Sequence, residues 1–202
     1  MINRAELKNQ AKATLKGNWD VAIVYFLLYT AIVGIISVTG VGALFTGVFT
    51  AGFVGIFMML TRGVRPELKD FFMKCVDGFV EKFVAGVLVT IFTFLWTLLF
   101  IIPGIIKAIS YSMTFYILND NPGMNGLDAI TESRKMMEGH KMEYFLLMLS
   151  FIGWWILTAL TFGILTLYVT PYMQATCAAF YEKLKGEKEE STDNIFENNS
   201  SF

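Results

Sequence analysis

Residues 21–61 read VAIVYFLLYTAIVGIISVTGVGALFTGVFTAGFVGIFMMLT, and none of them is Asp, Glu, Lys or Arg. A single α-helix needs only about 20 apolar residues to cross the hydrocarbon core of a bilayer. This run is about twice that length, so it predicts two membrane crossings that fold back on each other. Helices are the expected form because no backbone polar group can go unpaired in lipid.

Two later runs repeat this pattern. Residues 83–119 carry a single charged side chain, Lys107, and residues 144–181 carry none. Each run has room for two crossings as well. We therefore predict an all-α, polytopic membrane protein whose six transmembrane helices form three hairpins.

The composition of the whole chain supports this class. Hydrophobic residues make up 55% of the 202 residues and charged residues only 16%, against about 25% charged in soluble domains. This composition argues against a nucleic-acid binder with a basic surface, whereas the net charge of −1 carries no signal by itself. No cofactor is expected. Cys75 and Cys177 have no metal-binding or disulfide spacing, so we interpret them as small buried residues.

Glycine marks an internal repeat. Gly17, Gly78 and Gly139 lie 61 residues apart, and each ends a short charged segment just before an apolar run. An acidic residue stands eleven positions before each of them, where it suits the first turn of a helix. Three further glycines, Gly40, Gly104 and Gly163, are expected to mark the outer turns of the hairpins.

The repeat predicts how the chain is organised. We expect units at about residues 5–63, 66–123 and 127–186, each made of a cytoplasmic amphipathic helix followed by a transmembrane hairpin. Residues 1–181 then form a single membrane domain. The remainder, 182–202, is rich in acidic residues, Asn and Ser, and is predicted to be a disordered cytoplasmic tail.

The basic residues predict the orientation. Fifteen of the 16 lie in the segments 1–20, 62–82, 120–143 and 182–202, which six crossings would place on one side. By the positive-inside rule that side is the cytoplasm. The expected location is therefore the cell membrane, with both termini inside.

Few polar residues in or beside the apolar runs suggest a site. Lys107 is interpreted mainly as a side chain that reaches the outer headgroups. Asp120, Asn121 and Pro122 are more typical of a turn than of catalysis, and the single histidine, His140, lacks the neighbours of a metal site. Gln174 and the threonines at 90, 93 and 97 could belong to a polar path or simply to helix packing. Pro171 is expected to kink the last apolar helix, either as a hinge or only as a matter of shape.

One motif predicts close helix packing. Ala43, Gly47, Ala51 and Gly55 place a small residue at every fourth position of the second apolar segment. Such a ridge lets two helix backbones approach each other. Packing inside the bundle is the preferred interpretation, and packing against another membrane protein is the alternative.

Several stretches resemble a bacterial membrane-protein family known as domain of unknown function 975. The similarity lies in Leu15–Trp19, Tyr116–Leu118 with Asp120–Pro122, Ser133–Lys141, Leu149–Trp154 and the segment from Pro171-Tyr172 to Phe180-Tyr181. The resemblance covers nearly the whole chain up to the tail. It implies a multi-pass protein of a bacterial cell membrane, and it implies no activity, ligand or catalytic residue.

The sequence favours a protein that is not an enzyme and that binds or organises partners within the lipid bilayer. A transporter or permease for a small neutral or lipophilic substrate is the alternative. A lipid-modifying enzyme that uses Asp120 and His140 is a third, less favoured hypothesis, because no catalytic constellation surrounds them.

Overall fold

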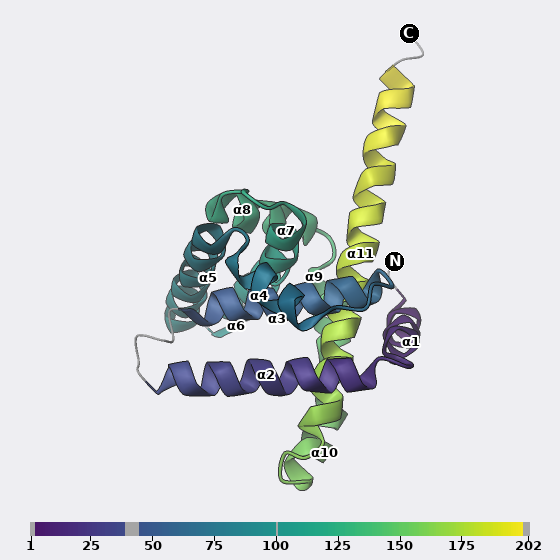
Figure 1. Cartoon of the computed structure of the whole chain (residues 1–202). Coiled ribbons are helices and arrows are strands. Elements are labelled where there is room, and N and C mark those ends of the chain that lie inside the picture. The colour runs from purple at the N-terminus through teal and green to yellow at the C-terminus, as the bar shows by residue number, and fades with distance from the viewer. Residues whose placement is uncertain (1–2, 39–44, 100, 200–202) are drawn as a thin grey trace.

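The computed structural model describes residues 3–38, 45–99 and 101–199, and these residues form helices joined by turns, without a strand (Figure 1). The all-α prediction is therefore confirmed over these ranges. The helices are α1 (Arg4–Leu15), α2 (Trp19–Ser37), α3 (Thr46–Thr61), α4 (Leu68–Val76), α5 (Phe79–Leu99), α6 (Ile101–Tyr111), α7 (Thr114–Asp120), α8 (Gly126–Met136), α9 (Lys141–Leu149), α10 (Ile152–Leu160) and α11 (Thr166–Asn199).

Three short helices, α1, α4 and α8, each end at a sharp corner that leads into a longer apolar segment. The corners are Gly17, Gly78 and Gly139, whose φ angles are +86°, +62° and +84°. Residues with a side chain rarely adopt this left-handed conformation, whereas glycine does so without steric cost. The 61-residue spacing therefore marks a real structural feature, a left-handed turn between a short helix and an apolar one.

The centre of the molecule is built from α3, α7 and the middle of α11. Helix α3 is buried along most of its length, with Ile56 and Phe57 fully inaccessible to solvent. Aromatic rings fill the space around it: Phe53 stacks on Tyr29 of α2 with ring centroids 4.6 Å apart. On the other side, Tyr116 of α7 stacks on Tyr181 of α11 at 5.3 Å.

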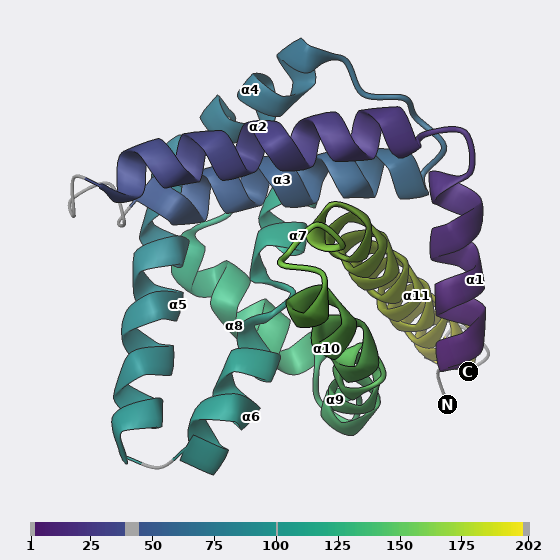
Figure 2. The same ribbon diagram turned by 90° about the horizontal axis from the view of Figure 1, so that it is seen from below.

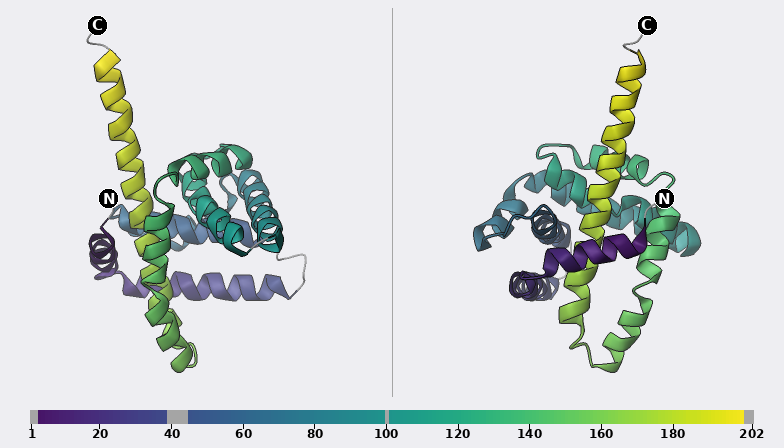
Figure 3. Two further views of the ribbon diagram at one scale, coloured as in Figure 1. Left: turned by 180° about the vertical axis from the view of Figure 1, so that it is seen from behind. Right: turned by 90° about the vertical axis from the view of Figure 1, so that its right-hand side faces the viewer.

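Three pairs of helices extend from this centre in different directions. Helix α2 lies beside α3, and α5 lies beside α6 (Figure 2). Helices α9 and α10 run together away from the centre and return through the first part of α11, while the far end of α11 projects in the opposite direction (Figure 3).

The prediction of six transmembrane helices is wrong for the described residues. Three segments are long and apolar enough to cross a membrane: Trp19–Ser37, Phe79–Leu98 and Lys141–Leu160, the last of which joins α9 and α10. Helix α3 has only 16 residues and is covered by other helices. The remaining two candidates are also short, because α6 stops at Tyr111 and the uncharged part of α11 ends at Tyr181.

The detailed repeat is likewise not confirmed as three equal hairpins. Gly163 does lie in a left-handed turn, but Gly104 lies inside α6, where it packs against Thr97, and Gly40 falls outside the described residues. The disordered tail stays a prediction, and the structure describes residues 182–199 as the continuation of α11. Its first turns beyond Tyr181 pack against the molecule, and Leu184 is buried.

Candidate functional site

Asp120 lies where the ends of α3 and α7 meet α11. Helix α3 stops at Arg62 and α7 stops at Asp120, so both side chains emerge beside the same stretch of α11. A nitrogen of Arg62 lies 2.6 Å from one carboxylate oxygen of Asp120. The Tyr181 hydroxyl donates to the other oxygen at 2.9 Å, and the ammonium of Lys185 lies 3.0 Å from it.

This group, which we call the Asp120 junction, contains Arg62, Asp120, Tyr181, Glu182 and Lys185. Arg62 also contacts Glu182 at 2.8 Å, so the two cations are balanced by two carboxylates. The side chain of Asp120 is only 7% exposed. Burial alone would raise the pKa of Asp120, but hydrogen bonds from Arg62, Lys185 and Tyr181 together hold that pKa below its usual value. A carboxylate held in this way is poorly suited to accept a proton and well suited to fasten three helices together.

A second buried polar group lies one residue earlier. The amide nitrogen of Asn119 donates to the carbonyl of Ala51 at 2.8 Å and to the carbonyl of Phe115 at 2.7 Å. Its oxygen accepts from the ammonium of Lys82 at 3.4 Å, and that ammonium donates to the carbonyl of Lys74 at 2.6 Å. Lys82 therefore satisfies a free carbonyl at the C-terminal end of α4, where the helix dipole favours a cation.

Asn119 and Lys82 were not identified from the sequence. Lys82 lies among the charged residues that precede an apolar run, and no local pattern distinguishes it from an exposed lysine. Its burial depends on the preceding helix α4 and on α7, whose Asn119 is 37 residues away and is brought to Lys82 only by the fold.

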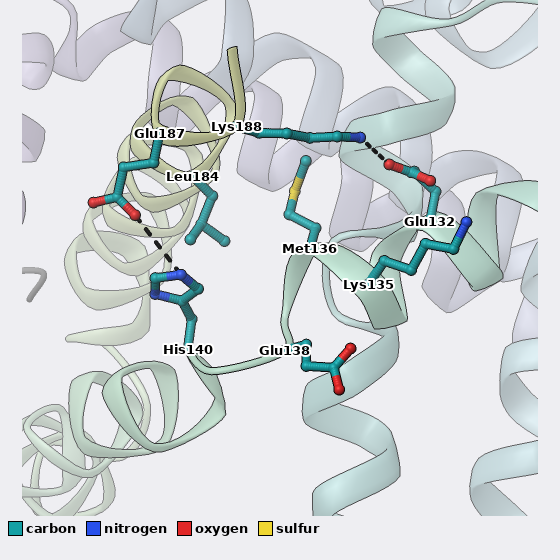
Figure 4. Close-up of a pocket in the computed structure, with 8 residues that line it drawn as sticks. All are labelled: Glu132, Lys135, Met136, Glu138, His140, Leu184, Glu187 and Lys188. Atoms are coloured by element: carbon teal, nitrogen blue, oxygen red, sulfur yellow. Dashed lines mark hydrogen bonds and ion pairs between the residues drawn. The ribbon is translucent and has the colours of Figure 1, made fainter. Parts of the chain in front are cut away.

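His140 lies in a separate cleft of about 420 Å³ between α8, the start of α9 and α11 (Figure 4). One ring nitrogen is 3.1 Å from Glu143 and the other is 3.7 Å from Glu187. Lys188 of α11 reaches Glu132 of α8 across the same cleft. No cluster that could hold a metal ion is present among the described residues.

His140 and Asp120 have different partners, and they do not form a shared catalytic arrangement. The remaining candidates are also dispersed. Lys107 lies over the ring of Trp96 at 4.9 Å, Gln174 accepts a hydrogen bond from Tyr116 at 3.5 Å, and Pro171 lies inside α11.

Asn121 and Pro122, which follow Asp120, end helix α7. The amide nitrogen of Asn121 donates to the carbonyl of Ile117 at 2.9 Å, and the exposed Pro122 follows it. Asn121 and Pro122 thus lie in the turn that follows α7. Asp120 in addition binds the side chains of Arg62, Tyr181 and Lys185 at the junction.

The small-residue ridge packs inside the molecule. Gly47 lies against Gly86 of α5 so closely that a Cβ atom on Gly47 would be 2.7 Å from the Gly86 Cα. A Cβ on Gly55 would be 2.9 Å from the oxygen of Asn119, and the carbonyl of Ala51 accepts from the same amide. Ala43 lies outside the described residues.

Comparison with known proteins places this architecture in a family. The model of a family described as "Protein of unknown function (DUF975)" matches residues 1–110 and 98–188, which together cover nearly all of the chain. The chain belongs to the DUF975 family. Neither the curated proteins nor the solved structures contain a match to it.

The family match agrees with the resemblance seen in the sequence and extends through the Asp120 junction. The two overlapping matches indicate an internal repeat in this DUF975 protein, although they do not divide it into three units. They end at residue 188, which includes the part of α11 that carries Glu182, Lys185 and Lys188.

Proposed function

We propose that this DUF975 protein is a multi-pass protein of the cell membrane that binds or assembles other membrane components and performs no catalysis. The observation that carries the proposal is the outward apolar surface of its three longest apolar segments. Large apolar side chains stand exposed along each of them: Val24, Leu27 and Ile35 on α2; Ile91, Phe94 and Leu98 on α5; Ile152, Ile156 and Leu160 on α10.

The energetics of these side chains favour lipid over water. Burying one side chain of this kind stabilises a protein by roughly 1.5–3 kcal/mol relative to exposure in water. Nine such residues left in water would therefore be a large penalty, and exposed apolar patches of this extent mark membrane or protein contacts. A surrounding bilayer removes the penalty without any further protein contact.

The charged groups support an orientation. The Asp120 junction and the cleft around His140 both involve α11 from Tyr181 onward, whereas α9 and α10 run beside the first part of α11 (Figure 3). In the proposed arrangement this later part of α11 and both termini are cytoplasmic, in keeping with the positive-inside rule.

The chemistry of the charged groups supports a binding role over catalysis. Asp120 is nearly buried and is held by two cations and a hydroxyl, so its role is to hold α3, α7 and α11 together. The groups best placed to contact partners are then the exposed apolar surfaces.

Site-specific photocrosslinking in native membranes tests the proposal. A photoreactive phenylalanine analogue in place of the exposed Phe94 should give a discrete adduct with another membrane protein. The same analogue in place of Phe53, which is 2% exposed, is the matched control and should give none. Adducts with lipid alone at Phe94, and likewise at Leu27 and Ile156, would contradict a partner-binding role.

One observation favours the transporter as a second candidate. A groove of about 590 Å³ lies between α5 and the segment 108–115, and its walls include Thr90, Thr93 and Thr97. However, the Thr90 hydroxyl donates to the carbonyl of Gly86 at 2.8 Å, and that of Thr97 donates to the carbonyl of Thr93 at 2.7 Å. Bonds of this kind within one helix leave the groove mostly apolar, which would suit a lipophilic substrate.

Flux measurements in proteoliposomes test this second candidate. If the groove carries a lipophilic substrate, replacing Ala108 in its wall by Trp should reduce flux, while replacing Ile105, which is exposed outside the groove, should not. Equal flux through both variants and through protein-free vesicles would remove the transporter from consideration.

A further inference from the structure

Helix α4 presents an apolar stripe that no other part of the described chain covers. Leu68, Phe72 and Val76 recur every fourth residue and are 58%, 47% and 70% exposed, and Met73 beside them is 60% exposed. The adjacent face of α4 is the one that packs on the protein, because Phe71 and Cys75 are buried. The helix is therefore apolar over two neighbouring faces, and only one of them is covered by protein.

The two related short helices differ from α4 in this respect. The residues 61 positions before Leu68, Phe72 and Val76 are Leu7, Ala11 and Leu15, in α1. The residues 61 positions after them are Ala129, Ser133 and Met137, in and beside α8. All six of these residues are buried. Helix α1 packs mainly on α11, and α8 packs on α5 and α7. Helix α4 is instead rotated about its axis, so that Phe71 and Cys75 face α3. This rotation leaves the face with Leu68, Phe72 and Val76 uncovered.

The open face of α4 leads directly into a membrane-spanning segment. Only Asp77 and Gly78 separate Val76 from Phe79, the first residue of α5. Phe79 and Val80 are exposed in their turn, so the apolar surface of α4 continues onto the first turn of α5. If α5 crosses the bilayer, as proposed above, the bilayer surface must lie beside the C-terminal end of α4.

The charges of this segment balance in number, because Arg65, Lys69 and Lys74 are matched by Glu67, Asp70 and Asp77. Arg65 pairs with Asp20 at 2.7 Å, and Lys69 pairs with Glu67 at 2.8 Å. A helix held to a membrane by attraction to anionic headgroups would show unpaired basic residues instead. Contact through buried apolar area is the alternative mode of interfacial binding.

We propose that α4 lies in the interfacial region of the inner leaflet, with Leu68, Phe72, Met73 and Val76 inserted among the lipid chains. This inference rests on the proposed membrane location and adds a specific lipid contact to it. Helices α1 and α8, whose equivalent faces are buried in protein, make no such contact. The insertion anchors the segment between α3 and α5 at a fixed depth.

Spin labels on single cysteines test the proposal in the full-length protein reconstituted into phosphatidylcholine vesicles. In a background with Cys75→Ala and Cys177→Ala, labels are placed at Phe72 on α4, at Leu95 on α5 and at Arg134 on the exposed face of α8. Collisions with oxygen, which concentrates in lipid, are compared with collisions with a water-soluble nickel complex. If the double alanine background fails to fold, the native cysteines can be kept, since they are only 5% and 6% exposed and will react slowly.

The label at Phe72 is expected to resemble that at Leu95, with a higher ratio of oxygen to nickel collisions than the label at Arg134. Adding anionic phosphatidylglycerol should leave this ratio unchanged. A label at Phe72 that behaves like that at Arg134, while Leu95 remains in lipid, would overturn the α4 proposal and leave the membrane location intact. A label at Phe72 shielded from both reagents would also overturn it, because a second copy of the chain would then cover α4. A water-exposed Leu95 would instead overturn the membrane location itself.

Discussion

Asp120 shows how one side chain can fix the ends of two helices, α3 and α7, to the middle of a third, α11. It accepts from Arg62, Tyr181 and Lys185, which come from α3 and from two positions on α11. Replacement of Asp120 by Asn would leave Arg62 and Lys185 without this counter-charge. We expect a loss of about 2 kcal/mol in the free energy of unfolding, as is typical for hydrogen bonds to a charged group. The exposed Glu138→Gln is the control and should change stability by less than about 0.5 kcal/mol.

The stabilisation by Asp120 should depend on pH. Its folded pKa is lowered, so its contribution is fully present above the unfolded pKa of about 4 and is lost as the pH falls through the lower folded pKa. The difference in thermal stability between the protein and Asp120→Asn should therefore shrink on acidification below pH of about 4. Unfolding scans in detergent measure this, and a difference that stays constant down to pH of about 2 would contradict the proposed ionisation.

Gly47 is a residue at which one methyl group should matter. A Cβ atom there would lie 2.7 Å from the Cα of Gly86, so Gly47→Ala must push α3 and α5 apart. We expect a destabilisation of about 1–3 kcal/mol, as for other overpacked cores. Gly34→Ala in α2 is the matched control, because no atom lies within 4 Å of its added Cβ and φ is not left-handed. Equal free energies of unfolding for Gly47→Ala and Gly34→Ala in denaturant titrations would contradict this prediction. They would show that α3 and α5 can move apart at Gly47 without cost.

The sequence identified Asp120 and the glycine ridge as candidates, but it could not supply their partners. Asp120 stands out because it directly follows a long apolar run, whereas Arg62 and Lys185 are 58 and 65 residues away and look like ordinary flanking cations. Asn119 was missed for the same reason, since its acceptor is the backbone of Ala51, 68 residues earlier. Local patterns mark unusual residues, and only the fold shows what satisfies them.

At the scale of elements, the left-handed glycines control where each short helix turns. Gly139 has φ +84°, and an added Cβ would meet no atom within 4 Å, so Gly139→Ala carries only the backbone cost of this conformation. That cost is roughly 1–2 kcal/mol. Gly153→Ala in α10, which has equal space but no left-handed backbone, should be neutral or slightly stabilising. If the two variants unfold at the same temperature, the corner at Gly139 is not a constraint on the fold.

The number of membrane-spanning helices shows the limit of counting apolar residues. The short helices and their glycine corners could be predicted because each depends on nearby residues. The second half of the 21–61 run could not be assigned correctly, because a helix packed inside a bundle and a helix surrounded by lipid have the same apolar composition. Helix α3 is buried on most sides and only 16 residues long, so its apolarity reflects the core of the protein.

At the scale of the whole molecule, large exposed apolar side chains lie on α2, α5 and α10, whereas buried and cleft-lining ion pairs lie where α3, α7 and α8 meet α11. Three helix pairs with apolar outer faces extend from a centre of α3, α7 and α11 (Figures 1 and 2). The charged groups of the Asp120 junction and the His140 cleft all involve α11 from Tyr181 onward. This separation is what a bilayer on one side and an aqueous compartment on the other would favour.

The central claim is that the chain crosses the cell membrane in this orientation, and labelling of single cysteines in intact cells tests it most directly. Ile164→Cys lies in the exposed turn between α10 and α11, and Arg134→Cys lies on the exposed face of α8. A membrane-impermeant thiol reagent added outside should label Ile164→Cys and should reach Arg134→Cys only after the membrane is permeabilised. Labelling of Arg134→Cys from outside, or release of the chain from membranes by an alkaline wash, would contradict the claim.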